Sequence, residues 1–316
     1  MTAADDPAGE AADDNAVASR DDAGPRVSIV IVTRNRCREL VTTLGRIRLV
    51  APASPVVVVD NASTDGTAEA VRASFPDIML IEASRNLAAA ARTVGVRRTA
   101  TPYVAFSDDD SWWAAGSLER AVAALDACPR LGLVAARVLV GPQEELDPTC
   151  AAMAESPLPP EPGLPGPLVL GFLACGAVVR REAFLAVGGF RELLGIPGEE
   201  ELLALDLATA GWRLAYLADV VAHHHPSPVR DSRQRRRRQT ANRLLVAWMR
   251  RPVRVVAART ASALLAPGTA TPAGVLDAVR ALPGALRERQ VLDPGLERRV
   301  RLLERQSRAP DSTSSG

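Results

Sequence analysis

The feature that most constrains the fold is a series of apolar, β-branched runs that alternate with helical segments and end in polar residues. Residues 26–35 (RVSIVIVTRN), 55–67 (PVVVVDNASTDGT) and 102–110 (PYVAFSDDD) show this pattern. Continuous apolar runs are typical of strands that are buried on both faces, as in a parallel sheet. Helical segments separate them, one up to about residue 50 and another at 86–100. We therefore expect an α/β fold with a mostly parallel central sheet and helices on both faces.

Further strands and helices complete this alternation. Residues 77–84 predict a short third strand, and a strand at 131–140 follows another helical segment. Residues 141–167 are rich in proline and predict a loop that crosses the site or an insertion. After this loop, residues 168–190 predict a strand, a turn and a short helix. Residues 198–225 predict a helix, a glycine turn and a strand that ends in histidines.

The composition divides the chain into four segments. Residues 1–24 are dense in aspartate and glutamate and hold almost no large apolar side chains, so we predict a disordered acidic tail. Residues 25–230 hold the alternating strands and helices and form the predicted α/β domain. Residues 231–306 predict an arginine-rich helical extension, and residues 307–316 predict a second disordered tail.

The sequence favours a cytoplasmic protein. Its N-terminus is not basic and then apolar, so no secretory signal is expected. The longest uncharged stretch, between Glu161 and Arg180, is broken by prolines and does not predict a transmembrane helix. The four cysteines show no CxxC spacing, which fits a reducing compartment.

Polar clusters follow three of the predicted strands. Thr33 and Asn35 end the first, Asp60 and Asn61 end the second, and Asp108–Asp110 end the fourth. In an open parallel sheet, ligands bind at the carboxyl ends of the strands. A single acidic residue at such an end is usually a helix cap or a turn former. Three clusters at one edge instead predict a binding site.

The three consecutive aspartates predict a bound cation, because adjacent carboxylates repel one another. Residues i and i+2 of a strand face the same side, so Asp108 and Asp110 are expected to point into one site and Asp109 away from it. Two carboxylates together with phosphate oxygens commonly hold Mg²⁺ or Mn²⁺. The pattern therefore predicts a divalent cation that binds a diphosphate.

Five motifs follow one another along the chain. They are VSIVIVTRN, VVVVDNASTDGT, NLAAAARTVGVRRTATPYVAFSDDD, CGAVVRREAFLAVGGF and GEEELLALDLATAGWRLAYLADVVAHH. In this order they resemble the motifs of the family 2 glycosyltransferases of the GT-A fold. The resemblance covers about residues 26–225 and implies a Rossmann-like GT-A domain, a nucleotide-sugar donor and a Mn²⁺ or Mg²⁺ cofactor. It also implies transfer of a sugar with inversion to an acceptor hydroxyl, in the synthesis of a cell-surface polysaccharide, glycolipid or glycoconjugate.

The resemblance implies roles for residues at matching positions. Thr33 and Asn35 would lie beside the nucleobase, and Asp60 would accept a hydrogen bond from it. Arg92 would lie near the donor. The aspartate triplet matches the DXD element, which binds the ribose and the metal-diphosphate. The implied donor-binding residues are Thr33, Asn35, Asp60, Arg92, Asp108 and Asp109, and the implied metal ligands are Asp110 and His223.

Glu199 and Glu200 match the family's ED pair, whose second member is the catalytic base. Glu200 has an ordinary pKa of about 4.3, so it is ionised at neutral pH and can take the proton of an attacking hydroxyl. Taken alone, the two glutamates could equally be a solvated first helical turn. Glu199 and Trp112 are assigned to the acceptor side, although Trp112 and Trp113 could also pack in the core.

The histidines at 223–225 do not predict an independent zinc site. Partners at ligand spacing are absent, and adjacent histidines on a strand cannot all face one ion. His223 is either an auxiliary ligand of the nucleotide-bound metal or a structural residue.

The chain departs from the family pattern at several positions. Glu200 replaces the usual aspartate of the ED pair, and this change keeps open a nucleotide- or glycan-binding module without turnover; a membrane-surface adaptor that works through the arginine-rich helices is a second alternative. Leu202 stands where the family has a further aspartate. The remaining departures are Asp206 for an arginine, Ala88 for a glycine and Thr93 for an asparagine.

The segment from Ser232 to Gly274 holds ten arginines and no acidic residue. Since the chain contains no lysine, this richness partly reflects a composition bias, and a solvated helical face is one interpretation. The other is peripheral contact with an anionic membrane at the inner face of the cell membrane, with Trp248 as a shallow anchor. The acceptor would then be a glycan, a lipid-linked molecule or a small molecule. Nucleic acid is an unlikely partner, because no aromatic platform accompanies the basic run.

Overall fold

The structure is a computed structural model of the chain, and it describes residues 24–226, 232–265 and 270–306. The two predicted tails lie outside the described residues, apart from Gly24 at the end of the first. The predicted boundary at 230–231 also lies outside them.

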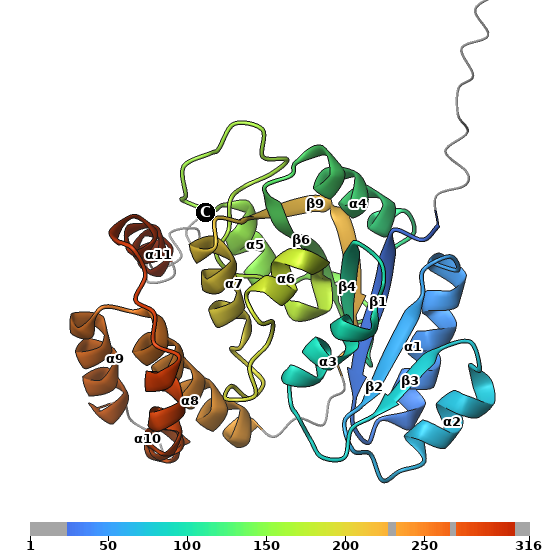
Figure 1. The fold of residues 1–316 in the computed structure, drawn as a ribbon, viewed down its shortest axis with the longest axis horizontal. Helices are drawn as coiled ribbons and strands as arrows, with labels where there is room; N and C mark the ends of the chain where they lie inside the picture. Colours follow the sequence, from blue (N-terminus) through green and yellow to red (C-terminus); the bar gives the residue numbers. More distant parts are fainter. Residues whose placement is uncertain (1–23, 227–231, 266–269, 307–316) are drawn as a thin grey trace, which may run out of the picture.

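Within the described residues, a nine-stranded sheet forms the centre of the molecule (Figure 1). Its strand order is β3-β2-β1-β4-β8-β6-β9-β5, and β7 pairs with β6. The pairings give β1, β2, β3, β4, β6 and β9 one direction, and β5, β7 and β8 run against them. The strands are β1 Val27–Thr33, β2 Val56–Asp60, β3 Met79–Glu82, β4 Tyr103–Asp108, β5 Ser111–Trp113, β6 Leu131–Val140, β7 Glu145–Leu146, β8 Ala177–Arg180 and β9 Arg213–His224.

Helices cover both faces of this sheet. α1, α2 and α4 pack on one face, and α3, α5, α6 and α7 pack on the other. They are α1 Cys37–Val50, α2 Thr67–Ser74, α3 Ala90–Arg98, α4 Ser117–Ala127, α5 Pro148–Ala154, α6 Arg181–Ala186 and α7 Glu200–Thr209, with a short 3₁₀ turn, η2, at Ala174–Gly176.

Strand β1 shows why these residues form a sheet with two covered faces. Ile29 and Ile31 point into the core beneath α1 and α4, whereas Val30 points into the core beneath α3. All three side chains are fully buried. The α/β fold with a mostly parallel sheet, predicted from the continuous apolar runs, is confirmed.

The helices after β9 pack against the outer side of α7 and form a third core with it. Leu202 and Leu205 of α7 meet Leu244 and Met249 of α8 in this core. The prediction of a helical extension is confirmed over the described residues. The extension consists of α8 Ser232–Arg250, α9 Val253–Leu265, α10 Ala270–Arg287 and α11 Pro294–Gln306.

The prediction that Trp248 is a membrane anchor was wrong. Its side chain is buried in the third core, and its indole N–H donates a hydrogen bond to Thr260 Oγ1 at 3.2 Å. Arg250 and Arg251 are buried as well, so part of the arginine-rich stretch faces inward. None of the described helices combines the length and the apolar character needed to cross a membrane.

Candidate active site

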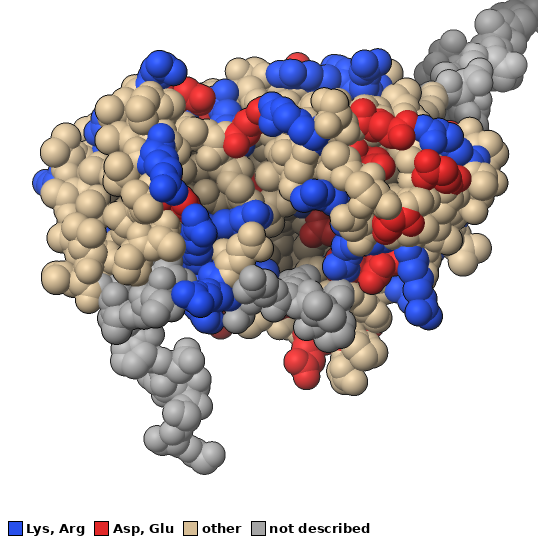
Figure 2. All heavy atoms as spheres, turned by 90° about the horizontal axis from the view of Figure 1, so that it is seen from below, with Lys and Arg blue, Asp and Glu red and all other residues tan. Residues whose placement is uncertain are grey.

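The polar clusters predicted at the strand ends meet at the carboxyl edge of the sheet. The strand register places Thr33 of β1 beside Asp60 of β2, and Val32 of β1 beside Asp108 of β4. This edge faces downward in Figure 1. Figure 2 shows it from below, where acidic and basic side chains surround a hollow in the middle of the molecule. Helices α3 and α7 and strand β9 bring further site residues to the same edge.

The first part of the site joins the end of β1 to the turn after β2. Asp60 is buried, and one of its carboxylate oxygens accepts a hydrogen bond from the Ser63 N–H at 3.0 Å. Asn35 adopts a positive φ of 53° and accepts a hydrogen bond from the Thr64 N–H at 2.8 Å. These bonds order the turn after β2, so Asp60 and Asn35 also act as turn formers. They also hold the Asp60 carboxylate at the edge of the sheet.

Asp109 is tied to the end of β1. Its carboxylate accepts a hydrogen bond from Thr33 Oγ1 at 3.0 Å and lies 2.8 Å from Arg36 Nε. Its backbone carbonyl accepts a hydrogen bond from Thr43 Oγ1 at 2.8 Å. This differs from the orientation expected from strand alternation. Strand β4 ends at Asp108, so the next two residues lie in a turn where that alternation no longer holds.

The other two aspartates also pair with arginine. Arg36 Nη2 lies 2.7 Å from one carboxylate oxygen of Asp110, so Arg36 bridges Asp109 and Asp110. Arg92 Nη2 lies 2.6 Å from Asp108. The sequence had indicated Arg92 but not Arg36. The only signal for Arg36 was its place just after β1, next to Asn35.

The histidines separate onto the two sides of β9. His224 Nε2 lies 3.2 Å from Asp110 Oδ1, so His224 faces the aspartates. His223 faces the other way, because its Nδ1 lies 2.8 Å from Glu144 and its ring stacks on Trp112 at 5.3 Å. The structure thus places His224, rather than His223, at the predicted metal site. It places Trp112 with His223, on the side away from the aspartates, whereas Trp113 is buried in the core.

These groups fit a divalent cation. Ligand atoms of Asp108, Cys175 and His224 all lie within 4.8 Å of one another, and Asp110 is beside His224. Two carboxylates and an imidazole suit Mn²⁺ or Mg²⁺ when phosphate oxygens complete the shell. Burial raises the pKa of the Cys175 thiol well above its usual value, and the charge of Asp108 raises it further. The thiol therefore stays protonated and is the weakest ligand of the group.

Arg92 connects the aspartates to the predicted glutamate pair. It is buried on α3, and its Nη1 lies 3.4 Å from Glu199 Oε1. Glu199 is only 2% exposed, and its Oε2 finds no hydrogen-bond partner among the described residues. Glu200 opens α7, is only partly buried, and accepts a hydrogen bond from the Gly198 N–H at 3.3 Å.

Two carboxyl groups of the site have strongly raised pKa values. Burial raises the pKa of Asp109 to about 7; the neighbouring Arg36 opposes this shift, and Asp110 and Asp108 add to it. Burial, followed by the charge of Glu200, raises the pKa of Glu199 to about 8, although Arg92 opposes it. The carboxylates at this edge outnumber the arginines, which is the electrostatic setting that favours an added cation.

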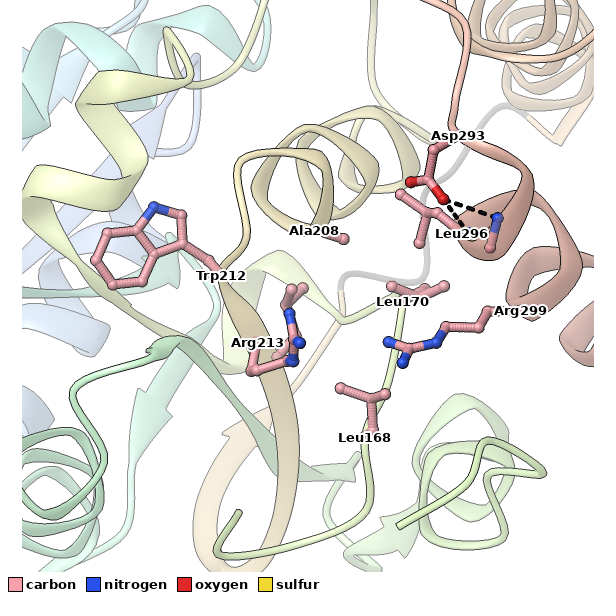
Figure 3. Close-up of a pocket in the computed structure, with 10 residues that line it drawn as sticks. Leu168, Leu170, Ala208, Trp212, Arg213, Asp293, Leu296 and Arg299 are labelled. Carbon is pink, nitrogen blue, oxygen red and sulfur yellow. Dashed lines mark hydrogen bonds between the residues drawn. The ribbon is translucent and has the colours of Figure 1, made fainter. Parts of the chain in front are cut away.

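A separate cavity of about 240 Å³ lies between β9, α7 and α11 (Figure 3). Arg213 and Arg299 line it, and both pair with Glu161, at 2.5 and 3.1 Å. Asp293, at its rim, accepts hydrogen bonds from the first turn of α11. None of the site residues predicted from the sequence lines this cavity, so we assign it to the junction with the C-terminal helices.

Comparison with known proteins agrees with this geometry. Residues 28–188 match the model of the glycosyl transferase family 2, and residues 166–279 match that of the glycosyl transferase family group 2. The first match covers just over half of the chain, which therefore belongs to glycosyl transferase family 2. A search of curated proteins found no match.

Solved structures of glycosyltransferases share the fold. The mannosyltransferase PcManGT from Pyrobaculum calidifontis, in complex with GDP-Man and Mn²⁺, aligns with a TM-score of 0.55 and 23% identity, over 90% of this chain and 80% of that one. TarS 1–349 from S. aureus, in complex with UDP-GlcNAc, aligns with a TM-score of 0.56 and 15% identity, over 84% of this chain and 82% of that one. At these identities the likeness establishes a GT-A fold.

Proposed function

We propose that this protein is an inverting, metal-dependent glycosyltransferase that moves a hexosyl or deoxyhexosyl group from a nucleotide-diphosphate sugar to an acceptor hydroxyl. The observation that carries this proposal is the convergence of the aspartate triplet, Arg92 and the glutamate pair at one edge of the sheet. The GDP-Man and UDP-GlcNAc complexes of similar folds support the class of donor. Synthesis of a cell-envelope glycan or glycolipid is the process we expect.

The donor would lie across the carboxyl edge of the sheet. Asn35 and Asp60 border the nucleobase position, and Asp60 can accept a hydrogen bond from an imide N–H of the base. Asp108, Asp110 and His224 would hold the divalent metal. When bound, that metal offsets the charge that grows on the leaving diphosphate. Arg92 keeps Asp108 in place through its 2.6 Å ion pair.

Glu200, rather than Glu199, is the proposed base. Glu199 is enclosed and paired with Arg92, so it cannot reach an acceptor. Glu200 is only partly buried at the start of α7. It takes the acceptor proton while the acceptor oxygen bonds to the sugar carbon and the bond from that carbon to the diphosphate breaks.

Thermal unfolding of the purified protein with UDP, GDP and dTDP, each with and without Mn²⁺ or Mg²⁺, tests the proposal. A ligand at a hundredfold over its Kd stabilises by about 2.7 kcal/mol. We expect a metal-dependent shift with one nucleotide, lost in Asp110→Asn and kept in Asp77→Asn, a surface control away from the site. Absence of a shift with every nucleotide would refute the proposed donor site.

Peripheral contact with an anionic membrane is part of the proposal, with an anchor that differs from Trp248. Leu276, Val279 and Leu286 of α10 are about half exposed, at 49%, 49% and 53%. Largely uncharged surface lies at the left of Figure 2, on the side of α9 and α10. Exposed arginines flank the apolar side chains. Asp277, the only acidic residue of α8, α9 and α10, is paired with Arg237 at 2.5 Å.

Apolar side chains insert into a lipid surface, and flanking arginines contact its anionic head groups. A lipid-linked acceptor would then lie close to the site. Sedimentation with anionic liposomes at low salt tests this contact. We expect the wild type to sediment and a Leu276→Glu, Leu286→Glu variant to stay in solution. Equal sedimentation of the two, or none with the wild type, would exclude this surface.

A further inference from the structure

The loop that leads into the glutamate pair is held by helix α8. Asn242 of α8 is 3% exposed, and its side-chain amide donates hydrogen bonds to the carbonyls of Gly195 and Pro197, the latter at 2.8 Å. Gly198, the next residue, has a φ of 104°, and a Cβ added to it would lie 3.5 Å from the Cβ of Asn242. The residue that follows is Glu199. One buried amide therefore fixes the backbone immediately before the proposed base.

A second contact with α8 lies further along α7. Arg250 Nε and Nη2 bind the two carboxylate oxygens of Asp206 at 2.5 and 3.0 Å. Both side chains are almost fully buried, at 4% and 8% exposed. Asp206 is the position at which the sequence departs from the expected arginine. In this chain Asp206 instead pairs with Arg250 of α8, about 40 residues later in the sequence. The pairing is therefore a feature of this chain and not of the family pattern.

We infer that α8 positions the proposed catalytic base, with Asn242 and Arg250 as its positioning residues. Asp206 lies six residues beyond Glu200, which is about 9 Å along a helix. The Asn242 bonds to Gly195 and Pro197 precede Glu200 in the chain and the Arg250 pair follows it, so α8 holds the chain on both sides of the proposed base. The position of Glu200 relative to the donor then depends on α8. The kinetic part of this inference rests on the proposed function, whereas its structural part does not.

Asn242 is not needed to attach α8 to the rest of the molecule. The third core already joins the two helices, because Leu202 and Leu205 of α7 pack with Leu244 and Leu245 of α8. The hydrogen bonds of Asn242 reach the loop and not this core. Loss of its amide should therefore free the loop while the helices stay together, which separates a positioning role from a purely structural one.

The test uses Asn242→Leu in the full chain, with Thr240→Val as a matched control. Thr240 is two residues away and bonds only to the α8 backbone, at Arg236 O. Hydrogen exchange of residues 195–201 should rise by about tenfold or more in Asn242→Leu and stay at the wild-type rate in the control. Because a displacement of about 1 Å can lower turnover by about 100-fold, kcat should fall by about 10- to 100-fold. Nucleotide Kd and Tm should stay near the wild-type values.

Each result decides a separate point. Unchanged exchange in residues 195–201 would overturn the positioning role, whatever the activity. An equal loss of nucleotide affinity and kcat would overturn it too, since that pattern marks general damage. If the wild type transfers no sugar, the proposed function fails, and hydrogen exchange still tests the role of Asn242. Should Asn242→Leu fail to fold, Asn242→Ala removes the amide donor without adding bulk or charge, with the same expected outcomes.

Discussion

Two of the clusters of arginine and carboxylate side chains among the described residues differ in their electrostatics. The edge cluster lies at the carboxyl end of the sheet, and the junction cluster joins α8, α9 and α11. The edge cluster comprises Asp108, Asp109, Asp110, Glu199, Arg36 and Arg92. The junction cluster comprises Arg251, Arg259, Arg301, Glu201, Glu297 and Glu304.

Burial acts on the carboxyl groups of both clusters, but the resulting pKa values differ in direction. The pKa values of Asp109 and Glu199 rise to about 7 and about 8. Burial raises those of Glu297 and Glu304 too, but the hydrogen bonds and charges of two arginines together outweigh it, so both pKa values fall below the usual value. The two arginines are Arg251 and Arg301 at Glu297, and Arg251 and Arg259 at Glu304. Four carboxyl groups share two arginines at the edge, whereas at the junction three carboxyl groups, those of Glu201, Glu297 and Glu304, share three arginines.

The difference distinguishes a binding site from a structural ion-pair cluster. In the junction cluster arginine charges already balance every carboxylate, so the cluster does not attract a further cation. The edge cluster holds excess negative charge in a buried place, and this favours either a proton or a metal ion.

The largest expected effect contrasts two adjacent glutamates that belong to different parts of the molecule. Glu200 borders the edge cluster, whereas Glu201 Oε1 lies 3.6 Å from Arg259 of the junction. We expect Glu200→Gln to lower kcat by about 10²- to 10⁴-fold, the usual contribution of a general base, with nucleotide Kd unchanged. Glu201→Gln should keep the wild-type kcat. Steady-state kinetics and a nucleotide titration measure both quantities, and a fully active Glu200→Gln would remove Glu200 from the mechanism.

The next effect concerns the junction. Arg251 is fully buried, and its guanidinium lies 2.7 Å from both Glu297 and Glu304. Arg251→Met leaves these carboxylates without their main partner and should lower the free energy of unfolding by about 3–5 kcal/mol. Chemical denaturation measures this loss, with the exposed Arg254→Met as the control. Folded Arg251→Met should bind nucleotide normally, and weakened binding would show that the two clusters are not independent.

The sheet and the composition of its edge were predictable from the sequence. Continuous apolar runs in β1, β2 and β4 could be buried only on two faces, and the polar residues after them had to share one edge. The register then brings Thr33, Asp60 and Asp108 together. This placement follows from the parallel order of neighbouring strands and needs no knowledge of distant contacts.

The details that were missed depend on distant contacts. The pairing of β6 with β9 has a register irregularity at Ala136/Arg137, and it decides which histidine faces the aspartates. Alternation of side chains along the sequence of β9 does not reveal this irregularity. Arg36 is one arginine in a chain that is rich in them, and its role appears only when the turn after β4 brings Asp109 and Asp110 to it. Trp248 had no signal that a third core would enclose it, because the residues packed around it come from other helices.

A smaller effect tests whether Arg36 occupies carboxylates that the metal needs. Arg36→Met removes the cation that bridges Asp109 and Asp110 at 2.8 and 2.7 Å. At pH 8, Mn²⁺ alone should then bind about tenfold more tightly, a difference of about 1.4 kcal/mol. Isothermal titration with Mn²⁺ in the absence of nucleotide measures this, with the neighbouring Arg38→Met as the control. Unchanged or weaker binding would mean that Arg36 and the metal do not compete.

The smallest effect is the pH dependence of stability, and its sign separates the two clusters. Asp109 and Glu199, with pKa values of about 7 and about 8, keep protons in the folded protein that the unfolded chain releases near pH 4. The free energy of unfolding should therefore fall as pH rises from about 4 to about 8. The junction acts in the opposite sense, since the lowered pKa values of Glu297 and Glu304 stabilise the fold above their usual pKa and stop doing so in acid.

Urea denaturation at pH 5 and pH 8 measures this change, and Asp109→Asn should reduce it. Saturating Mn²⁺ should also reduce it, because the positive charge of a metal beside Asp109 and Glu199 lowers their pKa values. If stability instead rises between pH 5 and pH 8, the carboxylates of the edge are ionised and compensated like those of the junction. The excess of negative charge that distinguishes the two clusters would then not exist.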